Sequence, residues 1–290
     1  MLYFTTTMEN GKDKALRVLV QKIPKLPTLP MIAERILGMV DDDVASVETI
    51  VETVAQDPAI AAKVLSFANA AFYGAGEPVL SVRDAVMKIG FKNIRSIALG
   101  ISLMTIFSES KEKFASAYHR IFLHSVSVGV ISRQIAEKVA CELADKAFIA
   151  GLLHDIGKLV INKYFEDDYA RILDEFNNGL FLIDAEKKVL GITHADIGVW
   201  LADKWNLPAI IQDAIEFHHA PSEAKNNRKL VALAHVANAV AARHSRGLFE
   251  VEPVNAFDSS ALEILGISEK DLETIESGLD KQTFPAELFQ

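Results

Sequence analysis

The stretch Ala150-Gly-Leu-Leu-His-Asp-Ile-Gly-Lys-Leu-Val160 places three polar side chains, His154, Asp155 and Lys158, inside an otherwise apolar helical run. Burial of such groups without partners is costly, so their apolar surroundings make them stand out. The imidazole and the carboxylate offer one nitrogen and up to two oxygens to a metal ion, and the lysine can meet an anionic oxygen that the metal holds. The alternative is a hydrogen-bonded helix end with a satisfied core histidine.

The composition is that of an ordinary globular protein. The chain has 290 residues, of which 50% are hydrophobic and 24% are charged, which leaves room for one large domain or two modest ones. Its 9 prolines and 15 glycines are too few for a turn-rich β protein and favour helices. The formal net charge of −9 argues against nonspecific nucleic-acid binding and against docking on an anionic membrane.

Cys141 is the only cysteine, which excludes an intramolecular disulfide and a thiolate zinc cluster. Any metal must therefore be held by His, Asp and Glu. The N-terminus lacks the basic start and apolar core of a signal peptide, and no run of about 18 uninterrupted apolar residues exists. We therefore expect a cytoplasmic protein without a membrane span.

Apolar spacing and capping signals predict helices throughout the first third of the chain. Ser46 and Asp57-Pro58 mark two helix starts, and Ser81-Val-Arg-Asp84 has the spacing of a capping box. Lys92 and Arg95 permit a DNA-reading helix-turn-helix as an alternative, but the apolar second helix favours a packed helical pair. The expected helices span 13–23, 31–40, 47–55, 58–73, 81–89 and 93–107.

From about residue 111 the predicted helices carry histidines. No Gly/Ser linker precedes them, so a boundary near 108–113 is expected to be a packed junction. Val251–Asn255 is the single weak strand candidate, and the pattern as a whole predicts an all-α fold. The expected helices span 112–139, 144–153, 166–177, 182–190, 193–205, 208–219 and 228–244, with two short ones within 259–280.

Five histidines are placed to face one centre together with Asp155. His124 lies on an inward helix face, His154 adjoins Asp155, and His194 opens a helix. His218 and His219 close a helix before Ala220-Pro221, so that both rings can turn towards one point. This is the composition of an oxygen-and-imidazole metal site. The remaining histidines, His119, His235 and His244, have no comparable context and are expected to be structural or exposed.

Leu152-Leu-His154-Asp155-Ile-Gly-Lys158 resembles the defining motif of the HD superfamily of metal-dependent phosphohydrolases. The surrounding sequence, over about residues 20–245, resembles one branch more closely, the HDOD domain (HD-related output domain). That resemblance rests on Leu26–Pro30 with Gln56–Ile60 and Lys63–Leu65, on Ser81–Gly90, and on Gly191–Gly198 through Trp205–Pro208 to His218-His219.

The resemblance implies a multi-helical HD-like domain with an N-terminal helical subdomain packed against it. We expect an N-terminal extension over residues 1–19, the N-terminal helical subdomain over 20–110, the HD-like subdomain over 111–250 and a C-terminal helical extension over 251–290. The closing helices lie outside the motifs that carry the resemblance.

The resemblance also implies a set of ligands. His124 would be the first ligand and His154-Asp155 the central pair, while the other three match histidines that the cyclic di-GMP-degrading branch adds: His194, His218 and His219. Lys158 matches a lysine that helps to hold phosphate or to activate water.

Two positions depart from that pattern. Asn238 stands where HD enzymes place a last aspartate, and Arg120 stands where some members of the cyclic di-GMP branch place an acidic ligand. Asn238 offers a neutral carbonyl as a degenerate ligand, and Arg120 adds repulsion if it points inward. A site that has lost negative charge is less able to create a hydroxide near neutral pH.

The sequence thus predicts a bacterial-type signal-transduction module, a binding or output domain that holds one or two divalent ions of Fe, Mn, Zn or Ni. Its expected partner is a regulatory protein or a nucleotide, bound between the two helical bundles. A first alternative is a metal-dependent phosphohydrolase acting on a nucleotide or phosphodiester, with Lys158 as a catalytic residue. A second alternative is a metal-free helical scaffold.

Overall fold

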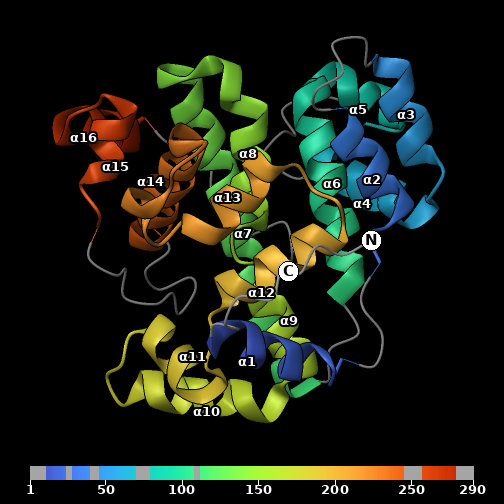
Figure 1. Ribbon diagram of the computed structural model, residues 1–290. Coiled ribbons are helices and arrows are strands. Elements are labelled where there is room, and N and C mark those ends of the chain that lie inside the picture. The colour runs from blue at the N-terminus through green and yellow to red at the C-terminus, as the bar shows by residue number, and fades with distance from the viewer. Residues whose placement is uncertain are drawn as a thin grey trace.

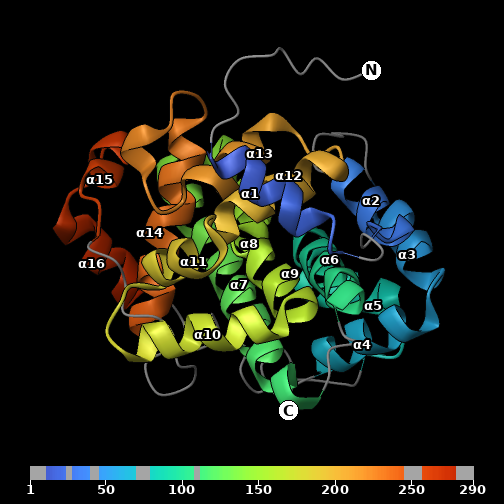
Figure 2. The ribbon, with the colours of Figure 1, turned by 60° about the horizontal axis from the view of Figure 1, so that its bottom comes forward.

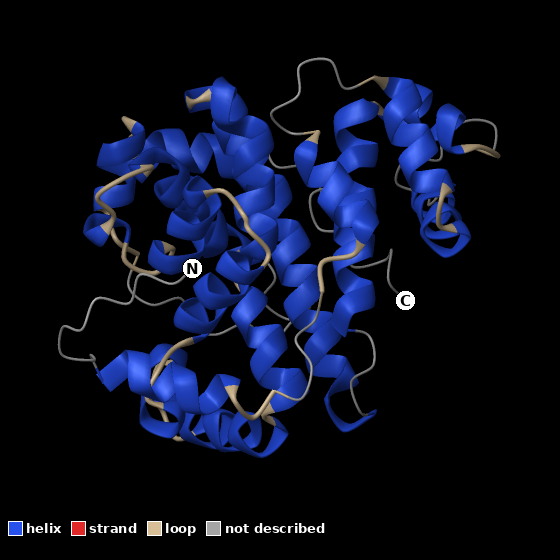
Figure 3. Ribbon diagram, turned by 45° about the vertical axis from the view of Figure 1, so that its right-hand side comes forward, coloured by secondary structure: helices blue, strands red, loops and turns tan. Residues whose placement is uncertain are grey.

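The computed structural model describes residues 11–23, 28–39, 46–69, 79–107, 112–244 and 257–278. Every regular element within these ranges is a helix, so the predicted all-α fold is confirmed (Figure 3). The strand candidate Val251–Asn255 lies outside the described residues. None of the described helices has the length and apolar character needed to cross a membrane.

Five helices pack into an N-terminal bundle at one side of the molecule (Figure 1). Their starts follow local signals in the sequence. The Ser46 hydroxyl accepts a hydrogen bond from Thr49 N–H, and the Ser81 hydroxyl accepts one from Asp84 N–H. The helices are α2 (Met31–Gly38), α3 (Val47–Ala55), α4 (Pro58–Asn69), α5 (Val82–Ile89) and α6 (Phe91–Phe107).

The larger bundle is organised around the long helix α7 (Glu112–Val139) and its close neighbour α8 (Ala144–Leu153). Two glycines let their backbones meet. A Cβ on Gly151 would lie 2.7 Å from the Val128 carbonyl oxygen, and one on Gly129 would lie 2.9 Å from the Phe148 carbonyl oxygen. The remaining helices of this bundle are α9 (Ile156–Tyr164), α10 (Glu166–Asn177), α11 (Leu182–Leu190), α12 (His194–Lys204), α13 (Ala209–Phe217) and α14 (Arg228–His244), with 3-10 turns at Cys141–Leu143 and Pro221–Glu223.

A charged cluster joins the two bundles where α6 meets α8. Asp145 Oδ1 lies 2.8 Å from Arg95 Nη2 and 3.8 Å from Arg133 Nη2, while its other oxygen lies 3.7 Å from Lys92 Nζ. The Arg95 side chain is buried and also donates to the Met39 carbonyl oxygen. The burial of Arg95 fits the predicted packed helical pair, whereas the Lys92 side chain stays largely exposed.

The two ends of the described chain both pack on the larger bundle. Helix α1 (Gly11–Val20) lies beside α11 and α12, where Lys12 Nζ is 3.3 Å from Asp196 Oδ1 (Figures 1 and 2). Helices α15 (Ser260–Leu265) and α16 (Glu269–Ser277) lie on the opposite side of the molecule from the N-terminal bundle, and α15 packs on α14.

Several predicted boundaries differ from the observed ones. The helix expected over 13–23 ends at Val20, the one expected over 31–40 ends at Gly38, and the one expected to begin at 93 begins at Phe91. Helix α4 ends at Asn69, and the remainder of the 58–73 prediction lies outside the described residues. Helix α9 was not predicted as a separate element, because the apolar run through 150–160 reads as continuous when contacts are unknown.

Candidate metal centre

The opening motif forms a break between two helices. Helix α8 ends at Leu153, α9 begins at Ile156, and His154 and Asp155 occupy the turn between them. Gly157 follows because a Cβ there would overlap the carbonyl oxygen of His194. This glycine lets α9 and α12 approach, which brings the Asp155 carboxylate within reach of the His194 ring.

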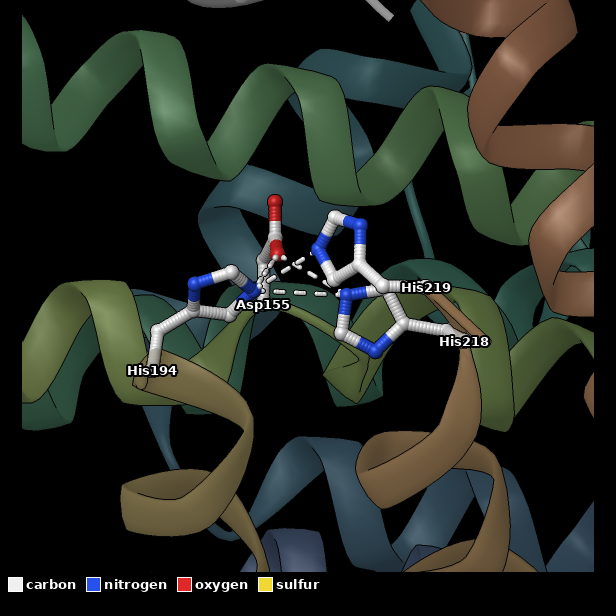
Figure 4. Close-up of side chains that lie close together, drawn as sticks. All are labelled: Asp155, His194, His218 and His219. Atoms are coloured by element: carbon white, nitrogen blue, oxygen red, sulfur yellow. Dashed lines mark hydrogen bonds and ion pairs between the residues drawn. The ribbon is translucent and has the colours of Figure 1, made fainter. Parts of the chain in front are cut away.

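One oxygen of Asp155 faces a group of three histidines (Figure 4). Asp155 Oδ1 lies 3.2 Å from His194 Nε2 and 3.6 Å from His218 Nε2. His194 Nε2 in turn lies 3.3 Å from His218 Nε2 and 3.1 Å from His219 Nε2. These four residues, Asp155, His194, His218 and His219, each place a ligand atom within 4.8 Å of the others, and we call them the first half-site.

The other oxygen of Asp155 faces a second group. Asp155 Oδ2 lies 3.2 Å from His154 Nε2 and 3.9 Å from His124 Nε2. His124 Nε2 also lies 2.9 Å from the Oδ1 atom of Asn238, on α14. We call Asp155, His124 and His154 the second half-site, with Asn238 at its edge. The two half-sites share one carboxylate.

Hydrogen bonds on the outer side of the rings orient three of these histidines. His154 Nδ1 lies 2.7 Å from Gly151 O, and His218 Nδ1 lies 2.8 Å from Ile215 O. A carbonyl oxygen only accepts, so each Nδ1 carries the proton and each Nε2 presents a lone pair to the centre. The His194 Nδ1 atom likewise carries a proton, because it lies 2.8 Å from a carboxylate oxygen of Glu186.

Glu186 was missed by the sequence interpretation. It is only 1% exposed and also accepts a hydrogen bond from the backbone N–H of His194. A signal for it was present, because Glu186 shares the apolar face of helix 182–190 with Leu182 and Val189. A carboxylate behind a ligand histidine is a recurrent feature of metal sites, where it fixes the ring and raises its basicity.

The spacing of the inward-facing atoms fits divalent metal ions. Ligand atoms bound to one ion at about 2.1 Å lie roughly 3.0 to 3.4 Å apart, and the separations here run from 2.9 to 3.9 Å. The Nε2 lone pairs of His194 and His218 face each other at 3.3 Å, an approach that needs a proton or a cation between them. His154 Nε2 is buried and in hydrogen-bond geometry with no described residue. The chemistry of nitrogen and oxygen donors suits Fe, Mn, Zn or Ni.

Electrostatics keep most of the site ready for a cation. Burial is the main reason that the pKa values of His124 and His218 fall to about 3, so both rings are neutral near neutral pH. Burial alone would raise the pKa of Asp155, but His154 and Lys158 hold it well below its ordinary value. Burial lowers the pKa of His194, but the carboxylates of Glu186 and Asp155 together outweigh it, and the pKa rises to about 9.

The remaining sequence candidates are distributed around this centre. Lys158 Nζ lies 2.9 Å from Asp155 Oδ2, and its side chain is 11% exposed. Arg120 is partly exposed on α7 and belongs to neither half-site. His119 is also partly exposed, whereas His235 is buried and donates to the carbonyl oxygen of His218. The roles of the site residues as ligands, and of Lys158 in catalysis, stay predictions.

Comparison with known families and structures agrees with this fold. The HDOD domain pattern matches residues 26–221. A solved HDOD domain protein of unknown function from Geobacter sulfurreducens superposes with a TM-score of 0.83 at 25% identity, over 95% of this chain and 97% of that one. A Marinobacter aquaeolei protein, provisionally named a signal transduction protein, gives 0.77 at 22% identity over 96% and 64% of the two chains. A Shewanella amazonensis protein, provisionally named a phosphohydrolase, gives 0.72 at 23% identity over 95% and 98%.

Curated relatives match at similar identity but are longer. An uncharacterized protein of Treponema pallidum is 26% identical over 241 residues, which is 79% of this chain and 45% of that protein. Ribonuclease Y of Mycoplasma mycoides is 27% identical over 159 residues, which is 54% of this chain and 26% of the enzyme. The chain thus spans less than half the length of these relatives.

Proposed function

The chain belongs to the HDOD family, and on that premise we propose that it is a signal-transduction module with one or two divalent metal ions in its core. The observation that carries the proposal is the position of Asp155, whose two oxygens face separate groups of histidine nitrogens. A carboxylate so placed can bridge two ions. A regulatory protein or a nucleotide, bound between the two helical bundles, would receive or deliver the signal.

Two features favour binding over turnover. His154, His194 and His218 are 0% exposed and Asp155 is 1% exposed, which suits an ion that is retained and does not suit a bulky substrate that must exchange. Asn238 then contributes a neutral oxygen where a carboxylate would add charge to the second half-site. Fewer donors of the kind that position a metal-bound water leave a weaker hydrolytic centre.

A metal-dependent phosphohydrolase is the second candidate, and Lys158 is the observation in its favour. When bound, divalent ions supply an acidified water that can attack phosphorus. Lys158 Nζ, now 2.9 Å from Asp155 Oδ2, would turn to a phosphate oxygen and stabilise the charge that develops there. The provisional phosphohydrolase name of the Shewanella amazonensis relative suggests the same chemistry.

Elemental analysis of the full chain, purified without added metal, tests the leading proposal. We expect between one and two equivalents of Fe, Mn, Zn or Ni, and content below about a tenth of an equivalent would contradict metal binding and favour the metal-free scaffold. Asp155→Ala should lose the metal. His119→Asn is the matched control, since His119 lies outside both half-sites, and it should retain the metal.

Turnover separates the two candidates once metal content is known. A panel of nucleotides and phosphodiesters is incubated with the protein and Mn²⁺ or Fe²⁺. Hydrolysis that Asp155→Ala and Lys158→Ala both abolish would establish the phosphohydrolase. Full metal occupancy without hydrolysis would leave the binding module, whose nucleotide partner can then be sought by thermal shift with the same panel.

A further inference from the structure

His235 joins the metal centre to the C-terminal helices. It lies on α14 and is 6% exposed. Its Nδ1 atom is 2.8 Å from the carbonyl oxygen of His218, and its Nε2 atom accepts a hydrogen bond from the backbone N–H of Asp258 at 3.1 Å. The His235 ring thus contacts both the backbone of His218, a predicted ligand, and the backbone of Asp258. Asp258 lies at the start of the C-terminal segment 257–278, which lies beyond residues 26–221, the range that the HDOD family matches.

The direction of both hydrogen bonds follows from the backbone groups. The Asp258 N–H can only donate, so His235 Nε2 must present its lone pair to it. The neutral ring then carries its proton on Nδ1, which donates to the His218 carbonyl oxygen. His235 is therefore held as one tautomer by two partners that lie on different elements.

The C-terminal segment is fastened to the same turn by further contacts. Asp258 shares hydrogen bonds with Ser222, in the 3-10 turn just after His218-His219. The Phe257 ring lies 5.4 Å from the His235 ring, measured between centroids. Beyond it, Leu262 of α15 is 5% exposed, on a helix packed against α14.

We propose that His235 is a positioning residue that couples docking of residues 257–278 to metal binding by the first half-site. The inference rests on the proposed metal site. His218 is fixed at two points, through its ring to Ile215 O and through its backbone to His235, and both fix where its Nε2 atom lies. Undocking the C-terminal helices removes the Asp258 N–H that holds the His235 tautomer, which loosens the second point, so metal and docking stabilise each other.

Such coupling is reciprocal. If docking tightens metal binding by some factor, metal must tighten docking by the same factor. Loss of an outer partner of a metal ligand costs roughly 10- to 100-fold in affinity. His235 acts through the backbone of His218, so we expect about tenfold, at the lower end of that range.

Hydrogen exchange on the unmodified full chain gives the first readout, with Mn²⁺ alone as the probe. Saturating Mn²⁺ should slow exchange of the Asp258 amide and of the amides of α15 by about tenfold. Metal affinity measured by calorimetry supplies the second readout.

Three variants distinguish coupling through His235 from a general loosening of the fold. His235→Phe keeps a ring against Phe257 and removes both hydrogen bonds, and it should weaken Mn²⁺ binding about tenfold and abolish the effect of metal on exchange. His235→Asn keeps an N–H near the Nδ1 position, and it should recover much of the metal affinity without the coupling. Glu175→Gln is the control, because it removes an ion pair with Lys188 that lies outside the C-terminal segment and should leave metal affinity unchanged.

The outcomes are distinguishable. A wild-type chain that binds no metal contradicts the proposed function, and this coupling fails with it. A chain that binds Mn²⁺ normally, with unchanged exchange at 257–265 and with His235→Phe binding as tightly as wild type, overturns only the coupling. Equal weakening by His235→Phe and Glu175→Gln would also overturn it, because that result indicates general loosening of the fold.

Discussion

The two half-sites contain the same kinds of side chain but differ in how well they are prepared for an ion. In the first half-site, the Nδ1 atoms of His194 and His218 are held by Glu186 and by Ile215 O. In the second, only His154 has such a partner, because His124 Nδ1 is buried without a hydrogen bond in the described part of the chain. His124 instead contacts Asn238 through Nε2, the nitrogen that an ion would need.

This difference shows that the outer hydrogen bonds of a histidine matter as much as its position. A ring whose Nδ1 proton already has an acceptor needs no change of tautomer to turn Nε2 towards an ion. For His124 to bind an ion, its proton must move from Nε2 to Nδ1. No described residue accepts a hydrogen bond from Nδ1 there. We therefore expect the first half-site to fill at lower metal concentration than the second.

The largest expected effect on metal affinity comes from removing the charge of Asp155, the carboxylate that the two half-sites share. Asp155→Asn keeps the shape of the side chain but takes its charge away from both groups of histidines. Metal affinity should fall by at least about 1,000-fold, with neither half-site occupied at micromolar metal. Calorimetry and metal content of the dialysed protein measure this, and retention of one equivalent would show that one half-site does not depend on Asp155.

Glu186→Gln should separate the half-sites. The amide still reaches His194 but no longer holds a negative charge behind it, so affinity of the first half-site should fall roughly 10- to 100-fold while the second changes little. Glu175→Gln is the matched control, since Glu175 pairs with Lys188 and belongs to neither half-site. An equal loss at both half-sites would argue against their independence.

Proton release should also mark the first half-site. The pKa of His194 is raised to about 9, so an ion that binds there below pH 9 must displace one proton. Affinity should rise about tenfold per pH unit between pH 6.5 and 9, and calorimetry in buffers of different ionisation enthalpy should count about one proton released. A count of zero would contradict the assignment.

The same shifts predict how stability of the ion-free protein depends on pH. The stabilisation by His194 is fully present below about pH 6.5, the ordinary value of an unfolded histidine, and is lost as the pH rises through its folded value of about 9. His124 and His218 have pKa values near 3, so their contribution falls as the pH drops below about 6.5. Thermal melts of the chelated protein should therefore show a maximum near pH 6.5.

The smallest expected effect is a gain in metal affinity at the second half-site. Asn238→Asp places a carboxylate 2.9 Å from His124 Nε2 and restores a negative charge near the ion. Affinity of this half-site should rise by about threefold to tenfold. Competition with a fluorescent chelator, titrated past the first equivalent, resolves such a change. Unchanged affinity would show that residue 238 does not contribute to ion binding.

Much of the helical architecture could be predicted because its causes are local. Helices 47–55, 166–177, 182–190 and 228–244 match the structure at both ends, and the Ser81 cap forms as its spacing predicts. Caps, prolines and apolar spacing act within a few residues, so the sequence displays them directly. The break at 154–155 was harder to predict, since it depends on the contact of Gly157 with the carbonyl of His194.

The residues of the candidate site could also be proposed from sequence, but their division into two half-sites could not. Motif and helix faces indicated that five histidines and Asp155 would meet, and they do lie together. Nothing local assigns one oxygen of Asp155 to His154 and the other to His194. That assignment depends on how three helices cross, which is set by the packing of the whole bundle.

By itself, the sequence of this protein determined its helices and the chemical kind of its centre, because helix propensity, capping and side-chain chemistry belong to the residues themselves. Tertiary structure decided the shared carboxylate, the partner of His194 and the link from His218 through His235 to Asp258. Each of these joins groups from separate elements, and hydrogen-bond geometry exists only once those elements are packed. The apolar stretch around His154 therefore indicates which kinds of side chain form the site, and the fold determines which nitrogen faces which oxygen.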